Sequence, residues 1–184
     1  MSNRATLVRM LARYSAKRGS FVLASGRVSD LYIDARLTTM RPDGLVLIGA
    51  LGLRALQELR WRADAVGGMT LGADPIAYAI SYASALTNTP VRAFTVRKEP
   101  KRHGTARRVE GPFQSGDAVV IVEDVITTGQ SAISAIEAIR AEGGVVSGVL
   151  GLVDREEGGS DTLRHMDLPV HCLTHASEIV AELS

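Results

Sequence analysis

The chain is poor in cysteine, with Cys172 as the only one among 184 residues. A single cysteine excludes an internal disulfide framework and any zinc or iron–sulfur site built from several cysteines. A reducing, cytoplasmic location is therefore the simplest expectation. Cys172 lies in an apolar stretch, which favours a place in the core over a reactive thiol.

Long hydrophobic runs are also missing. No stretch approaches the ~20 consecutive apolar residues of a membrane-spanning helix. The N-terminal string MSNRATLVRMLARYSAKRG has five Lys and Arg residues spread among its apolar positions, so it lacks the uninterrupted apolar segment of a secretion signal. We therefore expect no membrane partner.

Aromatic residues are scarce and the charges nearly cancel. Aromatics make up 4% of the chain, and 21 Lys and Arg against 20 Asp and Glu give a net charge of +1, which argues against a protein that coats nucleic acid. The exception is segment 97–108, where six Lys and Arg residues and His103 face only Glu99. Such a run is either a solvated surface loop, a nucleic-acid contact or a cationic loop for an anionic ligand. It contains no aromatic residue, so we expect no nucleic-acid partner.

Hydrophobic residues at 46% and charged residues at 22% are the proportions of a soluble globular domain. Apolar periodicity predicts helices at 4–17, 45–59, 75–86, 131–144 and 176–183, strands at 64–69, 91–96, 118–125, 145–154 and 170–174, and irregular strand and turn at 21–36. Strands that are apolar on both faces and alternate with helices indicate a parallel sheet covered on both sides. We predict an open α/β fold in a single domain, 1–184, whose N-terminal 1–40 is appended to a core at 41–184.

The segment after predicted strand 118–125 is the most informative, because open parallel sheets bind ligands at the carboxyl ends of their strands. Glu123 and Asp124 are followed closely by a Thr-Thr-Gly-Gln-Ser turn that opens the next helix. The free N–H groups of a helix start suit a phosphate, whereas the carboxylates require ligand hydroxyls, such as those of a ribose, or a bound Mg²⁺. Alternatively, Thr128 or Ser131 is a plain N-cap and the two carboxylates are solvated. Walker-type and GxGxxG patterns are absent, which disfavours nucleoside triphosphate hydrolysis and dinucleotide binding.

The string EDVITTGQS (123–131) resembles the signature of the type I phosphoribosyltransferases. In that signature two acidic residues meet the ribose hydroxyls of phosphoribosyl pyrophosphate (PRPP), and the following turn holds its 5′-phosphate. Three further segments resemble orotate phosphoribosyltransferase: FVLASGRVSDLYIDAR (21–36) its N-terminal motif, RKEPKRHG (97–104) its catalytic loop and VDREEGG (153–159) its orotate side. GGMTLGADPIA (67–77) stands where the family has its pyrophosphate loop, although Gly67 and Gly68 could merely end a strand.

This resemblance implies an open parallel-sheet phosphoribosyltransferase core flanked by helices, with a small N-terminal hood at 1–40 and a mobile loop at about 97–111. The implied catalytic residues are Lys101, His103 and Asp124. The implied PRPP and pyrophosphate contacts are Arg97, Lys98, Lys101, His103, Glu123, Asp124, Val125, Ile126, Thr127, Thr128, Gly129, Gln130 and Ser131. Thr127 and Arg155 are implied to contact orotate, although Arg155 could instead only pair with Glu156 or Glu157.

The implied activity is Mg²⁺-dependent transfer of the phosphoribosyl group from PRPP to orotate, giving orotidine 5′-monophosphate and pyrophosphate in pyrimidine synthesis. Mg²⁺ would be bound mainly through PRPP, with no dedicated protein ligands. The basic loop suits this chemistry, because cationic groups stabilise a departing pyrophosphate. The resemblance also implies a homodimer with shared active sites, in which the basic loop of one subunit closes over the PRPP site of the other.

One position departs from the family pattern. Some members have a Lys where this chain has Ala24, so Arg27 or a loop residue replaces that contact, or the contact is absent. Two rival functions remain: a type I phosphoribosyltransferase for another base, such as a purine, and a non-catalytic PRPP-sensing regulator. Lys98 and Lys101 in the leaving-group loop disfavour the regulator.

Overall fold

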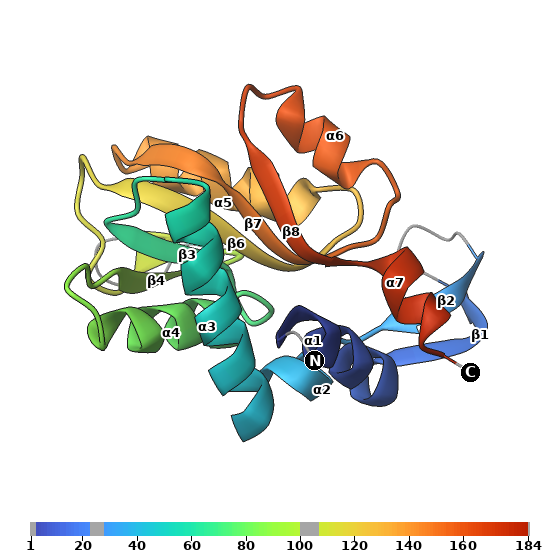
Figure 1. The fold of residues 1–184 in the computed structure, drawn as a ribbon. Coiled ribbons are helices and arrows are strands. Elements are labelled where there is room, and N and C mark those ends of the chain that lie inside the picture. Colours follow the sequence, from blue (N-terminus) through green and yellow to red (C-terminus); the bar gives the residue numbers. More distant parts are fainter. Residues whose placement is uncertain (1–2, 23–27, 100–106, 184) are drawn as a thin grey trace.

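The computed structural model describes residues 3–22, 28–99 and 107–183. Its centre is a six-stranded sheet in the order β5-β4-β3-β6-β7-β8 (Figure 1). The strands are β3 (Ala65–Met69), β4 (Arg92–Val96), β5 (Val109–Glu110), β6 (Ala118–Ile126), β7 (Val145–Asp154) and β8 (Val170–His175). All neighbouring pairs are parallel except β4 and β5. The predicted open parallel sheet is confirmed, except that the short edge strand β5, which was not predicted, is antiparallel.

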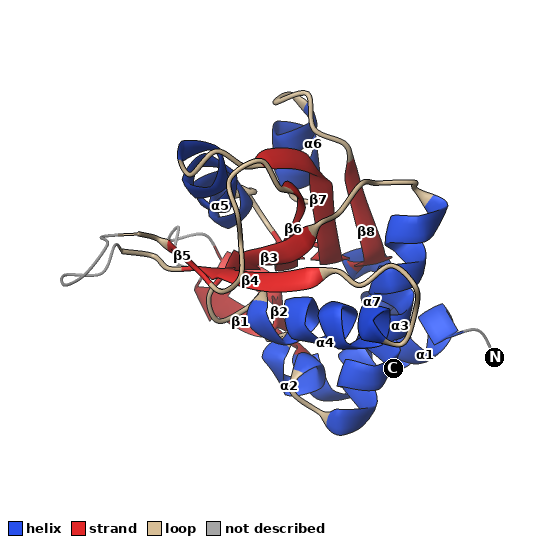
Figure 2. Cartoon of the chain, turned by 90° about the vertical axis from the view of Figure 1, so that its left-hand side faces the viewer, coloured by secondary structure: helices blue, strands red, loops and turns tan. Residues whose placement is uncertain are grey.

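Helices cover both faces of this sheet (Figure 2). One face carries α3 (Pro42–Glu58) and α4 (Asp74–Ala85), and the other carries α5 (Gln130–Ala141) and α6 (Gly159–Arg164). Each face has its own cluster of buried apolar side chains, because the strands are apolar on both sides. Cys172 of β8 is partly buried against the second cluster, and burial raises the pKa of its thiol to about 11. No helix in the described part of the chain is long and apolar enough to cross a membrane.

The N-terminal region forms a second, smaller unit of secondary structure beside the sheet. It consists of α1 (Asn3–Met10), the π-helical turn η1 (Leu11–Ser15), the antiparallel hairpin β1 (Ala16–Val22) and β2 (Val28–Ile33), and α2 (Arg36–Thr39). The C-terminal helix α7 (Ala176–Ala181) lies next to it (Figure 1). The predicted helix 4–17 runs too far, because the backbone at Ala16 is already extended and begins β1.

The strand order creates a crevice at the carboxyl ends of β3 and β6. These strands are parallel neighbours, but the chain leaves β3 for α4 on one face and β6 for α5 on the other. Loops that diverge in this way leave a gap between them, which is where open α/β sheets bind ligands. The fold therefore brings the predicted pyrophosphate loop and the EDVITTGQS segment to one place.

Candidate active site

A cavity of about 610 Å³ lies over this crevice. Its floor comes from residues 69–72 after β3 and from 123–125 at the end of β6. Residues 32–36, which run from the end of β2 to the start of α2, line another side. Lys98, Thr127, Ser131 and Arg155 complete the wall. The cavity is therefore built from segments that are far apart in the sequence, and it contains both carboxylates and cations.

The two acidic residues of β6 have different surroundings in this cavity. Glu123 is 7% exposed, and its Oε2 atom has no hydrogen-bond partner among the described residues. Burial, reinforced by the neighbouring Asp124 carboxylate, raises the pKa of Glu123 well above its usual range. Asp124 is partly exposed and accepts a hydrogen bond from the N–H of Val125 at 3.0 Å. The pair thus offers one carboxyl group that favours its neutral form beside one that is more accessible to solvent.

Glycine at position 72 allows the β3 loop to approach this pair. A Cβ atom on Gly72 would lie 2.5 Å from the Asp124 carboxyl group. Gly67 and Gly68 lie inside β3 rather than ending it, and a Cβ on either would collide with the carbonyl oxygen of Phe94 or Val122. Their role is therefore close packing of β3 between its neighbours, not termination of the strand.

Asp74 organises the loop after β3. Its carboxylate accepts hydrogen bonds from the hydroxyls of Thr70 at 2.7 Å and Thr95 at 2.9 Å. These bonds connect the ends of β3 and β4 to the first turn of α4, and the Thr70–Leu71 peptide bond between them is cis. Sequence reasoning missed this network, because nothing in the string indicates that Thr95 lies beside Asp74.

The turn after β6 opens helix α5. Gly129 is the N-cap, with a left-handed φ of 83°, and no side chain caps the helix there. Thr128 Oγ1 accepts the N–H of Gln130 in a long hydrogen bond of 3.5 Å, so the N-cap alternative holds in part for Thr128 and not for Ser131. The N–H groups that follow at the start of α5 precede the first bond within the helix and can serve a ligand. Thr127 and Ser131 line the cavity, whereas Thr128 and Gln130 do not.

Val125 and Ile126 differ in their access to the cavity. Val125 lines it, whereas the Ile126 side chain is 1% exposed and belongs to the core cluster on the α5 face. The Ile126 carbonyl oxygen accepts a hydrogen bond from the N–H of Arg155 at 2.9 Å. Ile126 thus supports the site through its backbone and its packing.

Arg155 connects the core to the hairpin. Its Nη1 donates to the Leu31 carbonyl at 3.1 Å, and its Nη2 donates to Ser29 Oγ at 3.2 Å and to Glu157 at 2.8 Å. The side chain is 7% exposed, and Nε has no partner among the described residues. Arg155 therefore pairs with Glu157, as one alternative held, but it also lies on the cavity wall between two elements.

The basic segment is only partly described. Lys98 lines the cavity, while Arg97 lies 3.8 Å from Glu110 and its N–H donates to the Arg108 carbonyl at 2.9 Å. Arg108 in turn donates to Ser134 Oγ of α5 at 2.9 Å. Lys101 and His103, as well as Ala24 and Arg27 of the N-terminal motif, lie outside the described residues.

Two charged cavity residues were not predicted as site residues. Asp34 and Arg36 form an ion pair of 2.8 Å at the end of the hairpin, and the hydrogen bond from Arg36 lowers the pKa of Asp34. Both lie in the N-terminal motif, so the motif itself was the available signal. Within the described ranges, no group of three or more His, Cys, Asp or Glu residues could hold a metal ion.

Comparisons with known proteins give the chain its family. No protein-family model matches it. It is 43% identical to orotate phosphoribosyltransferase from Aquifex aeolicus over 185 residues, which cover 98% of this chain and 99% of the relative. It is 44% identical to orotate phosphoribosyltransferase from Rhodopseudomonas palustris, and that alignment covers 97% of each chain. The crystal structure of Mycobacterium tuberculosis orotate phosphoribosyltransferase with PRPP superposes with a TM-score of 0.83 at 35% identity, covering 97% of this chain and 99% of that one. At this identity over nearly the whole length, the chain belongs to the orotate phosphoribosyltransferase family.

Proposed function

We propose that this protein transfers the 5-phosphoribosyl group of PRPP to orotate, forming orotidine 5′-monophosphate and pyrophosphate in the cytoplasmic synthesis of pyrimidine nucleotides. One observation carries the proposal: a carboxylate pair, a helix start with free N–H groups and a cationic wall share one cavity of about 610 Å³. The helix start suits a phosphate, the carboxylate pair suits the hydroxyls of a ribose, and the cationic wall suits an anionic base.

In this proposal each part of the cavity binds one part of the substrates. Glu123 and Asp124 accept hydrogen bonds from the ribose hydroxyls, and the turn of Thr127, Thr128, Gly129, Gln130 and Ser131 holds the 5′-phosphate through N–H and hydroxyl donors. Thr127 and Arg155 meet orotate. The pyrophosphate faces the 67–77 loop together with Arg97, Lys98, Lys101 and His103.

Catalysis consists mainly of stabilising charge as the bond between the anomeric carbon and pyrophosphate breaks. Positive charge develops on the ribose ring while negative charge grows on the leaving group, so Lys98 and Lys101 stabilise the latter. The ring nitrogen of orotate forms the new bond to the anomeric carbon as pyrophosphate leaves, and its proton passes to the departing pyrophosphate. Exclusion of water from the cavity protects the cationic ring from hydrolysis.

Mg²⁺ fits this site as a companion of PRPP. Asp124 presents a partly exposed carboxylate to the cavity beside Glu123, whose Oε2 has no partner among the described residues. Oxygen donors of this kind, added to phosphate oxygens and waters, are what Mg²⁺ binds. When bound with PRPP, the ion would neutralise charge at the pyrophosphate, and Asp124 would be the protein carboxylate placed to reach it.

We further propose a homodimer with shared active sites. An apolar surface between α3 and α4 supports an interface there, since Val46, Tyr82 and Leu86 are 75%, 73% and 78% exposed and line a hollow of about 660 Å³. Contiguous exposed apolar side chains of this kind mark association surfaces. Analytical ultracentrifugation that finds only monomers at micromolar concentration would contradict this assignment.

The activity is tested by following the ultraviolet loss of orotate with PRPP and Mg²⁺. We expect orotate to be consumed only when both are present, and adenine, guanine and hypoxanthine to be left unchanged. Turnover of a purine with no turnover of orotate would show that the protein is a phosphoribosyltransferase for a purine base. PRPP binding without turnover of any base would support the regulator.

A further inference from the structure

Glu156 has a backbone conformation that glycine usually adopts. Its φ is 59°, in the left-handed region, although it is neither glycine nor asparagine. The loop that contains it leaves β7 and reaches α6, and Gly158 in the same loop has a φ of 90°. A residue with a side chain keeps this backbone conformation only where surrounding contacts stabilise it.

One contact comes from inside the fold. The buried Asp154 carboxylate accepts the N–H of Glu156 at 2.7 Å through Oδ1 and the hydroxyl of Ser160 at 2.5 Å through Oδ2. The Asp154 carboxylate thus connects Glu156, near the start of the loop, to Ser160 at its end. Gly159 then packs against the turn before α5, where a Cβ would collide with the Thr127 carbonyl oxygen.

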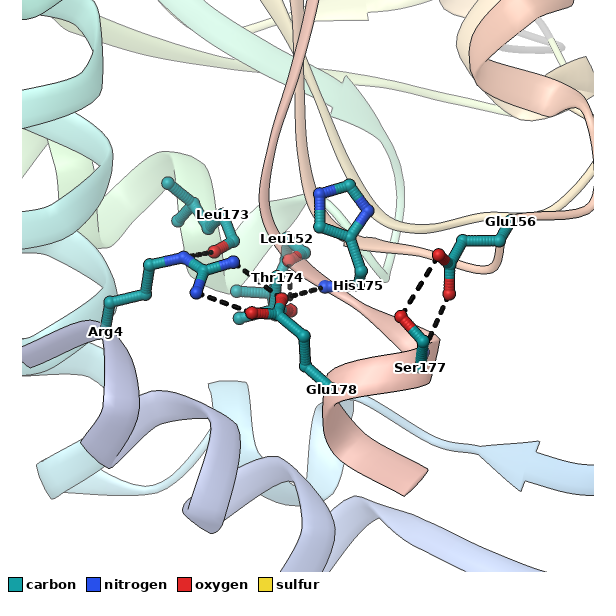
Figure 3. Close-up of polar contacts among 8 residues, drawn as sticks. All are labelled: Arg4, Leu152, Glu156, Leu173, Thr174, His175, Ser177 and Glu178. Atoms are coloured by element: carbon teal, nitrogen blue, oxygen red, sulfur yellow. Dashed lines mark hydrogen bonds and ion pairs between the residues drawn. The ribbon is translucent and has the colours of Figure 1, made fainter. Parts of the chain in front are cut away.

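The other contact comes from helix α7 (Figure 3). The Glu156 carboxylate accepts hydrogen bonds from the N–H of Ser177 at 2.7 Å and from its hydroxyl at 3.1 Å. The Ser177 N–H belongs to the first turn of α7, where the helix itself provides no acceptor. We call this pair of hydrogen bonds the Glu156–Ser177 link.

Helix α7 is itself held firmly at this end. Glu178 accepts the N–H of His175 at 2.9 Å and pairs with Arg4 of α1 through two contacts of 2.6 Å (Figure 3). Arg4 also donates to the carbonyl of Leu173 in β8 at 2.9 Å. The Glu156–Ser177 link therefore attaches the loop to a fixed point rather than to a free end.

Arg155 lies directly before this strained residue. Its guanidinium group spans to the hairpin at Ser29 and Leu31 and lines the cavity. Its Nη2 also pairs with Glu157 at 2.8 Å, and the backbone angles of Glu156 set where Glu157 lies relative to Arg155. We propose that the Glu156–Ser177 link is a positioning device that fixes the Arg155 guanidinium on the base side of the cavity. The inference rests on the proposed function, in which Arg155 contacts orotate.

A purely structural role would give a different signature. Glu156 and Ser177 are both exposed, and hydrogen bonds exposed to water contribute little to the free energy of unfolding. A positioning role instead predicts a selective loss of orotate binding, because a small displacement of a substrate-orienting group weakens only the interaction that the group makes.

The experiment compares Glu156→Asn with Glu156→Gln. Asparagine tolerates the left-handed conformation but is one methylene shorter, so its amide falls short of Ser177. Glutamine keeps the length, and its amide can accept the N–H and donate to the hydroxyl. We expect Glu156→Asn to raise the KM for orotate by about tenfold, with the KM for PRPP and the melting temperature unchanged. Glu156→Gln should stay near the unsubstituted protein.

Asp167→Asn is the matched control, since Asp167 has the same φ of 59° and is exposed. It should change neither KM. An unchanged KM for orotate in Glu156→Asn, or an equal rise in both KM values, overturns the inference while leaving the orotate activity in place. Absence of orotate turnover in the unsubstituted protein overturns the proposed function and the inference together.

A double substitution tests whether Glu156 acts through Arg155. In an Arg155→Gln background, Glu156→Asn should add no further rise in the KM for orotate, because the group that it positions is already missing. Independent effects that multiply would overturn the positioning role, since residues that act separately show additive free energies.

Discussion

Glu123 and Asp124 are neighbours in the sequence, but their position at the end of β6 gives the two carboxyl groups different surroundings. Glu123 is buried without a partner for Oε2 among the described residues, whereas Asp124 is partly exposed and hydrogen-bonded. Burial penalises the charged form of a carboxyl group, and a neighbouring negative charge adds to that penalty. The pair therefore places a buried carboxyl group with a raised pKa beside a second carboxyl group that solvent reaches more easily.

The raised pKa of Glu123 predicts how stability depends on pH. A carboxyl group with a pKa above its unfolded value of 4.5 contributes stability that is complete below about pH 4.5 and is lost as the pH rises through the raised pKa. Glu123→Gln keeps the neutral form at every pH. We expect its melting temperature to match the unsubstituted protein at pH 4 to 4.5 and to exceed it increasingly as the pH rises, roughly up to the raised pKa.

Glu142→Gln serves as the control for this pH series, because Glu142 is also a glutamate but is partly exposed and lies outside the cavity. The difference between Glu142→Gln and the unsubstituted protein should not grow with pH above 4.5 in the same way. A constant offset for Glu123→Gln across the whole pH range would contradict a raised pKa of Glu123.

A second prediction at the residue scale separates binding from chemistry. Lys101→Ala removes charge that is needed mainly as pyrophosphate leaves, so kcat should fall by about 10²- to 10³-fold while PRPP binding weakens less. Asp124→Asn should raise the KM for PRPP as well as lowering kcat, because the proposed contact of Asp124 with the ribose is already made in the ground state. Steady-state kinetics with PRPP varied at saturating orotate measure both. Near-normal rates in both variants would show that these residues are assigned wrongly.

Element by element, the sequence predicted the long and periodic parts of the fold best. β6 and β7 are continuous apolar runs, and α3 begins at Pro42, so their signals were strong over many residues. The elements α2 and β5 have four and two residues, which is too short for a periodic pattern to be recognised. The six-residue helix α6 was also missed, although α7 of the same length was predicted. Helix 4–17 was predicted too long because no proline or glycine interrupts the pattern before Ala16.

The turn before α5 provides the prediction at the element scale. Gly129→Ala places a Cβ in left-handed backbone and close to the Gly159 carbonyl oxygen, at 3.1 Å. We expect a loss of stability of about 1 kcal/mol or more, together with a fall in PRPP affinity because the N–H groups at the start of α5 shift. Thermal unfolding and calorimetric titration with PRPP measure the two effects.

Gly116→Ala is the matched control for that experiment. Gly116 also has a left-handed φ, 91°, and a Cβ there would meet nothing within 4 Å among the described atoms. It should lose similar stability from the backbone conformation but bind PRPP normally. Equal losses of PRPP affinity in both variants would mean that the effect is global, and that the turn has no special part in phosphate binding.

For the whole molecule, local strings could predict the phosphate turn but not how distant segments meet. EDVITTGQS contains both the acidic pair and the helix start, so its chemistry was readable in one place. The contact of Arg155 with Leu31 spans 124 positions, and the bond between Thr95 and Asp74 depends on β3 and β4 being neighbours. Such contacts follow from the sheet order, which periodicity alone does not determine.

The proposed homodimer predicts complementation between two inactive variants. Lys101→Ala and Asp124→Asn proteins, each nearly inactive, are unfolded and refolded together. Random pairing makes about half of the dimers mixed. If the basic loop of one subunit serves the PRPP site of the other, one site of a mixed dimer has both substitutions and the other has neither. About a quarter of all sites should then regain full activity.

The arithmetic distinguishes a shared site from one built within a single subunit. If Lys101 and Asp124 act in the same chain, each site is built from one chain only. Every site of a mixed dimer then still contains one of the two substitutions, so no activity returns. Differently tagged variants show by sequential affinity purification that mixed dimers have formed. A mixture proven to contain them, yet no more active than its parents, would rule out the shared site. The assignment of Asp124 to PRPP would survive that result, because its evidence lies in the cavity of a single chain.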